Sequence, residues 1–559
     1  MSIFFKINVY LHTQENQKNY FCLIFKPNMS IQTLSYKDTG YFSKLICDYL
    51  EENEQLKPFY NHFPTLEAFQ AQMDEKQKKI PLQTRLLLAK RILYQYGAHT
   101  LSQSTLANID LLKEENTFTV TTGHQLNLFT GPLYFLYKIF SVINLTERLK
   151  KAYPNHHFVP IFWMATEDHD FEEINHFYFR NNKITWNSEA SGAVGELSTA
   201  GLEAFSRCLQ KEFGQSENGQ KLSKLFHEAY VTHKTLDQAT RYIANQLFRT
   251  YGLVIVDGND KELKACFAPY VKEELENRLS FHAITETTKR LTEKGYPEQV
   301  HPREINLFYL NKNIRERIVY QENRYHVLNT SIAFTKDEIL DELQNYPERF
   351  SPNALLRPLY QEVILPNLCY IGGGGELAYW FQLKDYFHQV DVPFPILVLR
   401  NSVLLIQQKW IDKLNKLNVA VDKLFLSKEQ LTTDLTYELS PIPIDFSTQK
   451  EHLQNQFQQL YAIAELTDGS FLGAVAAQEK KQLNGLNKLE KRLLRAQKRK
   501  FSDTINRILS IQDELFPQQS LQERHHNFSE FYIENGTQLM DILKAELDPL
   551  DFNFKIITL

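Results

Sequence analysis

Two short strand-like runs separated by a helix-length segment place the strongest constraint on how this chain can fold. The first, Thr117–Thr122 (TFTVTT), consists of β-branched and aromatic residues and predicts a strand. The second, Phe158–Ala165 (FVPIFWMA), is almost continuously apolar. Near-continuous apolar runs are typical of parallel strands that are buried on both faces. The segment between them has Pro132 near its start and is predicted to be helical to about Lys150. Strand, helix and strand in this order form a βαβ unit, so we predict an α/β core around a parallel sheet.

Three later runs extend the predicted sheet, namely Leu253–Asp257, Asn367–Gly375 and Pro395–Leu399. Short runs of apolar, β-branched and aromatic residues that end at turn residues are typical of strands. The core is therefore predicted to span residues 117–402, with connecting insertions near 180–250 and 281–350. Within the second insertion, Leu307–Leu310 and Arg317–Val327 are expected to form a hairpin. A helix is expected from Glu376 to about Phe387.

The segment ahead of the core, residues 29–116, is predicted to be mainly helical. Its apolar residues between Leu82 and Leu93 recur at helical spacing. Met1–Asn28 lacks the apolar stretch and the cleavage site of a signal peptide. Because Met29 begins a stretch with the character of a new start, we expect residues 1–28 to be a leader outside the fold.

The pattern changes after Asn401. A helix is expected over Lys409–Leu426, and leucines and other apolar residues then recur at three-and-four spacing as far as Leu515. This spacing predicts an α-helical coiled-coil domain over residues 403–520, with the chain reversing near Asp468–Ala476 and Pro517 ending the second helix. The remaining residues, 521–559, are expected to return to the core.

The composition excludes several classes of protein. The chain has 559 residues, 43% of them hydrophobic, and a formal net charge of -5. This balance predicts several globular domains and disfavours nucleic-acid binding, which usually needs a basic excess. The basic run Lys488–Lys500 is interpreted as a solvated face of the coiled coil. No apolar run is long enough for a membrane helix. The five cysteines are scattered along the chain, so a structural zinc site is unlikely, and the pattern fits a protein of the reducing cytoplasm.

The loop after the first strand is the first candidate site. Ligands of open parallel sheets bind at the carboxyl ends of the strands, and a helix N-terminus suits phosphate. His124 can donate a hydrogen bond to a phosphate oxygen or to developing negative charge. Lys138 lies near two turns into the helix, and its direction is left open. The residues predicted to bind a nucleotide here are Gly123, Gln125, Thr130 and Gly131.

An acidic segment follows the second strand. Thr166–Asn175 (TEDHDFEEIN) carries five carboxylates and a histidine. These groups suit three tasks: holding an amine, holding a metal ion on substrate phosphates, or general-base catalysis by His169. Asp168 and His169 are the predicted catalytic residues with His124, and Glu167 and Asp170 are predicted to bind substrate. Glu172 remains open between a functional and a surface role.

A glycine run after the Asn367 strand is the third candidate site. Gly372, Gly373 and Gly374 allow close approach of a ribose or an adenine, and Glu376 is grouped with them as a nucleotide-binding residue. Arg357 and Arg400 are predicted to clamp a carboxylate or a phosphate, because a guanidinium offers two parallel donors.

Together these segments resemble the BshC family of cysteine-adding enzymes of bacillithiol synthesis. The resemblance rests on TGHQLNLFTGPLYFLYK, FVPIFWMATEDHDFEEIN and SPNALLRPLYQEVILPNLCYIGGGGELAYW and covers the chain from about Met29 onward. It implies a Rossmann-like core with connecting insertions, similar to class I aminoacyl-tRNA synthetases, and a coiled coil that mediates homodimerisation. The HIGH motif of that class is absent, since residues 134–137 are YFLY. No clear KMSKS motif appears either.

The resemblance also implies an activity. The expected reaction joins cysteine to the amine of glucosaminyl malate and gives bacillithiol, with ATP as the activating nucleotide and Mg²⁺ as a candidate metal. Asp168 and His169 would hold the cysteine ammonium or deprotonate the attacking amine. Two alternatives are a nucleotide-binding dimeric scaffold that supports a partner enzyme, and a transfer enzyme that works without ATP.

Overall fold

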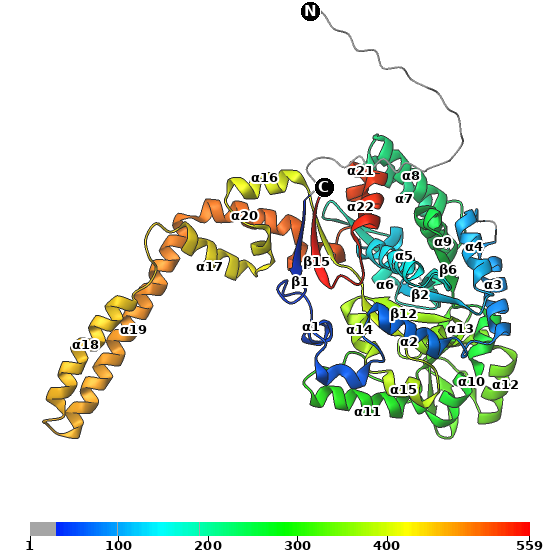
Figure 1. The fold of residues 1–559 in the computed structure, drawn as a ribbon, viewed down its shortest axis with the longest axis horizontal. Coiled ribbons are helices and arrows are strands. Elements are labelled where there is room, and N and C mark those ends of the chain that lie inside the picture. The colour runs from blue at the N-terminus through cyan, green and yellow to red at the C-terminus, as the bar shows by residue number, and fades with distance from the viewer. Residues whose placement is uncertain (1–29, 98, 189–190) are drawn as a thin grey trace, which may run out of the picture.

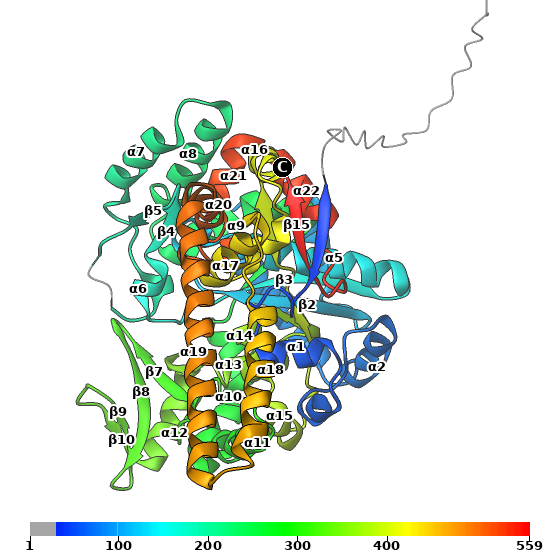
Figure 2. The same ribbon diagram turned by 90° about the vertical axis from the view of Figure 1, so that its left-hand side faces the viewer.

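The computed structural model describes residues 30–97, 99–188 and 191–559. The leader expected at 1–28 and the start expected at Met29 lie outside these residues. Figure 1 shows an α/β body from which a long helical hairpin projects, and in Figure 2 the two helices of this hairpin lie next to each other in front of the body.

A five-stranded parallel sheet forms the centre of the body. Its order is β13-β12-β2-β3-β6, and every neighbouring pair is parallel. The strands are β2 (Thr117–His124), β3 (His157–Met164), β6 (Val254–Asp257), β12 (Asn367–Gly372) and β13 (Ile396–Leu399). All eight residues of β2 are buried, as expected for a strand inside a parallel sheet that is covered on both faces. The predicted α/β, Rossmann-like fold class is confirmed.

Helices cover this sheet. The crossover from β2 to β3 is α5 (Tyr134–Ala152), which shares an apolar core with α2 (Leu66–Lys76) through residues such as Phe69 and Leu145. Other helices against the sheet are α3 (Leu82–Tyr96), α4 (Gln103–Leu111), α9 (Leu236–Phe248) and α14 (Gly374–Trp380). The remaining helices of the body are α1 (Lys44–Leu50), α6 (Phe171–Ile174), α13 (Arg357–Ile364), α15 (Lys384–Gln389), α21 (Phe528–Asn535) and α22 (Thr537–Glu546).

Two insertions interrupt the core. The first contains the hairpin β4 (His176–Phe179) and β5 (Asn182–Thr185), then α7 (Leu202–Phe213) and α8 (Glu217–Tyr230). The second insertion comes after the helices α10 (Lys261–Asn277) and α11 (Leu279–Glu293). It contains an antiparallel sheet of order β10-β9-β8-β7-β11 and the helix α12 (Lys336–Asn345). Its strands are β7 (Leu307–Asn311), β8 (Ile314–Gln321), β9 (Arg324–Val327), β10 (Ala333–Phe334) and β11 (Phe350–Pro352).

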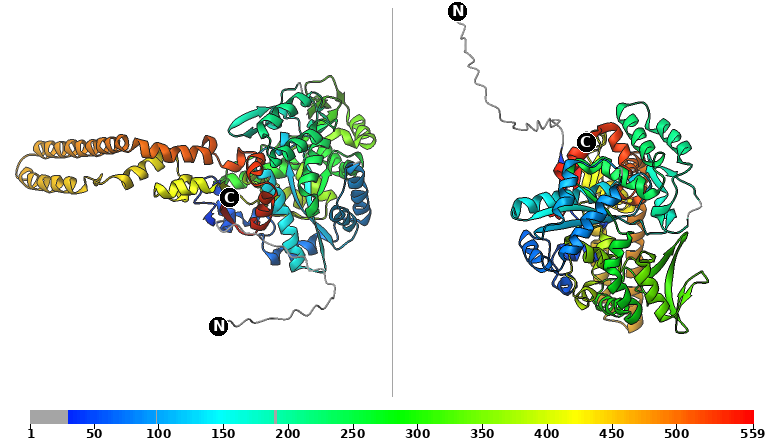
Figure 3. Two further views of the ribbon diagram at one scale, coloured as in Figure 1. Left: turned by 90° about the horizontal axis from the view of Figure 1, so that it is seen from above. Right: turned by 90° about the vertical axis from the view of Figure 1, so that its right-hand side faces the viewer.

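The projecting hairpin is the coiled coil. It consists of α18 (Ser447–Ala464) and α19 (Gly469–Lys500), which pack through Phe457, Ala464 and Val475. The helices α16 (Gln408–Lys416), α17 (Lys428–Leu439) and α20 (Ser502–Leu515) connect it to the body. Seen from above in Figure 3, the hairpin extends well beyond the body.

A small sheet joins the two ends of the described chain. The C-terminal strand β15 (Asn553–Thr558) lies between β1 (Ile31–Ser35), to which it is antiparallel, and β14 (Val403–Ile406), to which it is parallel. The connection to the coiled coil therefore begins at β14, beside the end of the chain.

Several sequence-based boundaries were wrong. The segment Arg317–Val327 is not one strand, because a turn with left-handed residues at 322 and 323 separates β8 from β9. The helix expected over 376–387 is divided into α14 and α15, and the one expected over 409–426 ends at Lys416. The coiled coil reverses earlier than expected, because Asp468 accepts hydrogen bonds from the backbone of Ser470 and Phe471 and so starts α19.

Candidate active site

The order of the sheet places the candidate crevice between the ends of β2 and β12. From β2 the chain proceeds outward through β3 and β6 on one side, and later through β12 and β13 on the other. The loops after β2 and β12 therefore leave the sheet in different directions. This is the topological switch point, where ligands of open α/β sheets bind. The first and third candidate segments of the sequence meet here.

An ion pair between a buried lysine and a partly exposed glutamate joins the two strand ends. Lys138 on α5 donates to the carbonyl oxygen of Gly123 at 2.8 Å and lies 2.7 Å from a carboxylate oxygen of Glu376. Glu376 in turn accepts from the backbone N–H of Gly373 at 2.7 Å and from the hydroxyl of Tyr370 at 3.3 Å. Burial acts to raise the pKa of Glu376, but the charge and hydrogen bond of Lys138, the backbone N–H of Gly373 and the charge of Arg357 together hold that pKa below its ordinary value. Lys138 thus points into the site, which the sequence left open.

His124 ends β2 inside this crevice. Only 6% of the residue is exposed, and its Nε2 atom is buried without a hydrogen-bond partner among the described residues. Burial and the nearby charge of Lys138 lower its pKa well below the ordinary value, so the imidazole stays neutral. A buried polar atom without a partner is costly, and an arriving ligand would supply the missing partner.

The loop after His124 has a strained backbone. Phe129, Thr130 and Gly131 all have positive φ angles, of 48°, 68° and 63°. A side chain at Gly131 would lie 2.6 Å from the Cβ atom of Asn127. Such strain persists only where the surroundings fix it, and here Asn527 donates to the carbonyls of Phe129 at 2.8 Å and Gly131 at 2.6 Å. The hydroxyl of Thr130 is also buried without a partner among the described residues.

The glycines at the crevice leave room beside charged side chains. A Cβ atom at Gly123 would lie 3.3 Å from the Tyr370 hydroxyl, and one at Gly373 would lie 3.6 Å from Nε of Arg400. One at Gly372 would lie 3.0 Å from the Tyr370 ring. At Gly374 the neighbour would be Ile46. Side chains at Gly123 and Gly373 would therefore narrow the space beside Arg357 and Arg400.

Two arginines lie at this crevice. Arg357 begins α13 and donates to Gln361 at 3.1 Å and to the Tyr379 hydroxyl at 3.3 Å. Arg400 follows β13 and forms a buried ion pair of 2.8 Å with Glu523. The guanidinium of Arg400, the ammonium of Lys138 and the ring of His124 all lie within 6 Å of the centre of the Tyr134 ring. Basic groups therefore surround the start of α5.

The acidic segment lies beside this crevice, at the end of β3. Gln125 donates to Asp168 at 2.9 Å and links the two loops. Arg315, from the second insertion, donates to Nδ1 of His169 at 2.8 Å. Burial acts to raise the pKa of Asp168, but hydrogen bonds from His169 and Gln125 and the charge of Arg315 hold it below its ordinary value. Asp168 is therefore an ionised, half-buried carboxylate.

The other acidic residues have structural partners. Glu167 forms an ion pair of 2.6 Å with the buried Lys264. Asp170 accepts a hydrogen bond from the backbone of Glu173 and caps α6. Glu172 is exposed. The assignment of Glu167 and Asp170 to substrate binding stays a prediction. Asp168 and His169 are the two residues of this segment that Gln125 and Arg315 contact beside the crevice.

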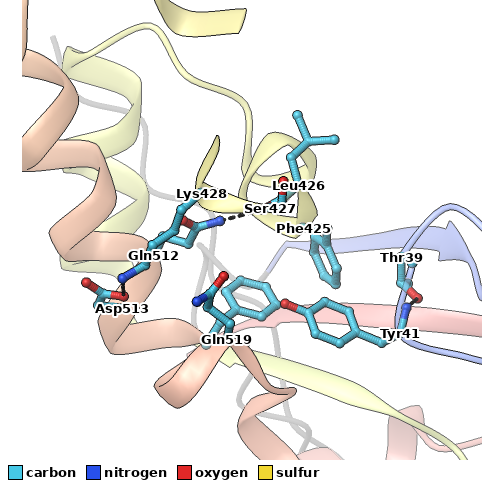
Figure 4. A pocket seen from close by; sticks show the side chains of 11 residues that line it. Thr39, Tyr41, Phe425, Leu426, Ser427, Lys428, Gln512, Asp513 and Gln519 are labelled. Carbon is cyan, nitrogen blue, oxygen red and sulfur yellow. Dashed lines mark hydrogen bonds and ion pairs between the residues drawn. The ribbon is translucent and has the colours of Figure 1, made fainter. Parts of the chain in front are cut away.

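A separate cavity lies where the body meets the base of the coiled coil. It has a volume of about 190 Å³ and lies between Tyr41 of the body, Phe425 and Phe516, with Tyr41 stacked on Phe516 (Figure 4). Lys428 and Asp513 form an ion pair on its wall. In the ranges that the structure describes, no group of three or more His, Cys, Asp or Glu residues is placed to hold a metal ion, the cysteines at 47, 208, 266 and 369 are free, and no helix is long and apolar enough to cross a membrane.

Comparisons with known families match both parts of the chain. Residues 29–401 match the family described as the N-terminal Rossmann-like domain of the bacillithiol biosynthesis protein BshC. Residues 403–559 match the C-terminal coiled-coil domain of the same protein. The chain belongs to the BshC family.

Curated relatives agree over nearly their whole length. A protein of Flavobacterium johnsoniae described as "Putative cysteine ligase BshC" is 55% identical over 95% of this chain and 100% of its own. Relatives with the same description in Christiangramia forsetii and Cytophaga hutchinsonii are 54% and 38% identical, over 95% and 94% of this chain and 99% and 98% of their own. The expected membership of the BshC family is confirmed, and the predicted ligase class agrees with the description of these relatives.

Sequence patterns missed several residues of the site. Arg315 lies in a hairpin insertion, and Glu523 and Asn527 follow the coiled coil, so neither local spacing nor strand order connects them with β2. Tyr370 and Tyr379 stand inside the quoted NLCYIGGGGELAYW segment. They could have been found by asking which side chains flank the glycine turn.

We expect Asn527→Ala to loosen the strained loop, because it removes the donors that hold the carbonyls of Phe129 and Gly131. The free energy of unfolding should fall by about 1–3 kcal/mol. Amide hydrogen exchange over residues 127–131 should accelerate. Asn535→Ala, which removes a bond to one helix carbonyl, is the control and should leave that exchange unchanged.

Asp257 lies at the end of β6, and burial raises the pKa of its carboxyl group to about 6. The unfolded chain ionises this carboxyl near pH 3.9. Burial therefore destabilises the fold above about pH 6, and this penalty disappears as the pH falls below about 4. Asp257→Asn should raise the urea midpoint at pH 8 and lose that advantage at pH 4.5. An equal gain at both pH values would contradict the assignment.

Proposed function

We propose that this BshC-family chain is the ligase that joins the carboxyl group of cysteine to the amine of glucosaminyl malate, with ATP as the activating nucleotide. The observation that carries the proposal is the switch-point crevice itself. It brings Lys138, Arg357 and Arg400 together with buried polar atoms of His124 and Thr130 that have no partner among the described residues. Basic groups and free hydrogen-bonding atoms at the carboxyl ends of two parallel strands suit a phosphate or a carboxylate.

The crevice fits a nucleotide in its local chemistry. Gly123, Gly131 and the Gly372–Gly374 turn place backbone without side chains at the two strand ends, and Nε of Arg400, which has no partner among the described residues, lies beside Gly373. His124 stays neutral and can donate or accept one hydrogen bond. Mg²⁺ would be held chiefly by nucleotide phosphates rather than by a protein cage. In this arrangement Arg357 and Arg400 orient the anionic groups of the two reactants.

The acidic pair suits the binding of an amine. Arg315 carries only donors, so Nδ1 of His169, 2.8 Å from it, must accept the hydrogen bond. The other imidazole nitrogen of a neutral His169 then carries the proton and serves as a donor. Asp168 is the ionised group beside it. We therefore assign Asp168 to the ammonium of cysteine and His169 to its orientation.

The reaction provides the direct test. Pure protein with ATP, Mg²⁺, cysteine and glucosaminyl malate should yield a product with the mass of bacillithiol, detected by mass spectrometry. Asp168→Asn should raise the KM for cysteine at least tenfold, since it removes the charge that pairs with the ammonium. Asp110→Asn, on the surface of α4, is the matched control and should not change it. Absence of product under all nucleotide and metal conditions would contradict the proposal.

We further propose a homodimer formed through the coiled coil. Several apolar side chains of the hairpin point away from its own core. They are Leu460, Ile463, Leu466, Phe471, Leu472 and Leu489, each 40–87% exposed. Exposed apolar residues gathered on one element mark an interaction surface, and a second copy of the same hairpin has the complementary character.

Replacing Ile463 and Phe471 together by Asp should dissociate the dimer, because each charge would be buried at the interface. Light scattering after size-exclusion chromatography measures the change in mass. Ile442→Asp, an equally exposed site outside the hairpin, should leave the mass unchanged. A wild-type chain that is monomeric at all concentrations would refute the dimer.

A further inference from the structure

A fully buried ion pair lies behind the candidate site. Lys76, at the end of α2, and Glu362, on α13, are both 0% exposed, and their charged atoms are 2.9 Å apart. Lys76 also donates to the backbone carbonyl of Glu362 at 2.9 Å. Burying two charges costs several kcal/mol per ion, and apolar replacements are often as stable. Stability alone therefore does not explain why two charged residues are buried here.

Hydrogen bonds connect this pair with Arg357. Glu362 accepts from the side-chain amide nitrogen of Gln361 at 3.1 Å, and the amide oxygen of Gln361 accepts from Arg357 at 3.1 Å. The chain of contacts thus runs from Lys76 through Glu362 and Gln361 to the guanidinium. Arg357 is itself 3.8 Å from the position of a Cβ atom at Gly123, which places the end of the chain in the crevice.

The chemistry of the two end groups fixes the orientation of the amide between them. An ionised carboxylate only accepts hydrogen bonds, and a guanidinium only donates them. Gln361 can satisfy both only with its nitrogen toward Glu362 and its oxygen toward Arg357. If the amide turned over, it would place N–H donors against the donors of Arg357.

Burial raises the pKa of Glu362, whereas its neighbours favour the ionised carboxylate. Its carboxylate receives hydrogen bonds from Lys76, Gln361 and the side chain of Asn367, the last at 2.6 Å. Each of these groups presents an N–H donor, so a proton on the carboxyl would have no acceptor among them. The oxygen of Asn367 is fixed in turn by the hydroxyls of Thr119 and Thr121 on β2, at 3.1 Å and 2.8 Å. The network is thereby anchored to the same strand that carries the site.

We propose that Glu362, with Lys76 as its counter-ion, is a positioning residue that acts through Gln361 to align Arg357 for an anionic group of the substrate, a carboxylate or a phosphate. This inference rests on the proposed function only in assigning anion binding to Arg357. The hydrogen bond to Gln361 fixes the orientation of the Arg357 guanidinium and so directs its remaining N–H donors. A correctly aligned arginine loses less conformational entropy when it binds its ligand.

The test is a double-mutant cycle measured by isothermal titration calorimetry on the full chain, with glucosaminyl malate and ATP as separate probes. Gln361→Leu keeps the volume but removes both hydrogen bonds. We expect it to raise the Kd of one probe about tenfold, which corresponds to about 1.4 kcal/mol. The probe that responds distinguishes a carboxylate from a phosphate. With Arg357 already replaced by Ala, the same change should alter Kd by less than twofold.

Glu362→Gln should shift Kd in the same direction, because its amide no longer dictates the orientation of Gln361. The matched control is Glu274→Gln, which alters another buried, hydrogen-bonded carboxylate, near the end of α10. It should lower Tm without changing Kd. Equal Kd values for wild type and Gln361→Leu, equal shifts in both Arg357 backgrounds, or a wild type that binds neither probe would overturn the inference. A wild type that binds but forms no product would overturn the proposed function alone.

Discussion

The contact between Lys138 and Glu376 holds the candidate site together. Lys138 reaches back from the crossover helix to the end of β2, and Glu376 reaches back from α14 to the end of β12. Their ion pair therefore ties together the two turns that diverge at the switch point. Without it, the carbonyl of Gly123 and the backbone N–H of Gly373 would each lose a partner. The His124 loop and the glycine turn depend on this contact for their relative position.

The site also depends on the chain that returns from the coiled coil. Glu523 pairs with Arg400, the carbonyl of His526 accepts from the backbone of Leu133 at the start of α5, and Asn527 supports the strained loop. All three lie between α20 and α21. The crevice thus consists of core strands and of a segment that follows the hairpin. This arrangement gives a physical route by which association of two hairpins can influence the site.

Sequence patterns could predict the strands and the place of the chemistry, but not the partners of each charge. The β-branched and aromatic residues of β2 and the apolar run of β3 indicated two strands, and the glycines at the end of β12 marked its turn. The pairings of Arg315 with His169 and of Glu523 with Arg400 join residues more than 100 positions apart. No local periodicity records such contacts. The fine boundaries also escaped, since the turn that divides β8 from β9 depends on two residues with positive φ.

Ligands are proposed to bind at the crevice between β2 and β12. Hydrogen–deuterium exchange of the full chain with and without ATP and glucosaminyl malate tests this most directly. We expect slower exchange at residues 123–131 and 372–376 when the ligands are present. Protection confined to the cavity at the base of the coiled coil, with unchanged exchange in both turns, would contradict it.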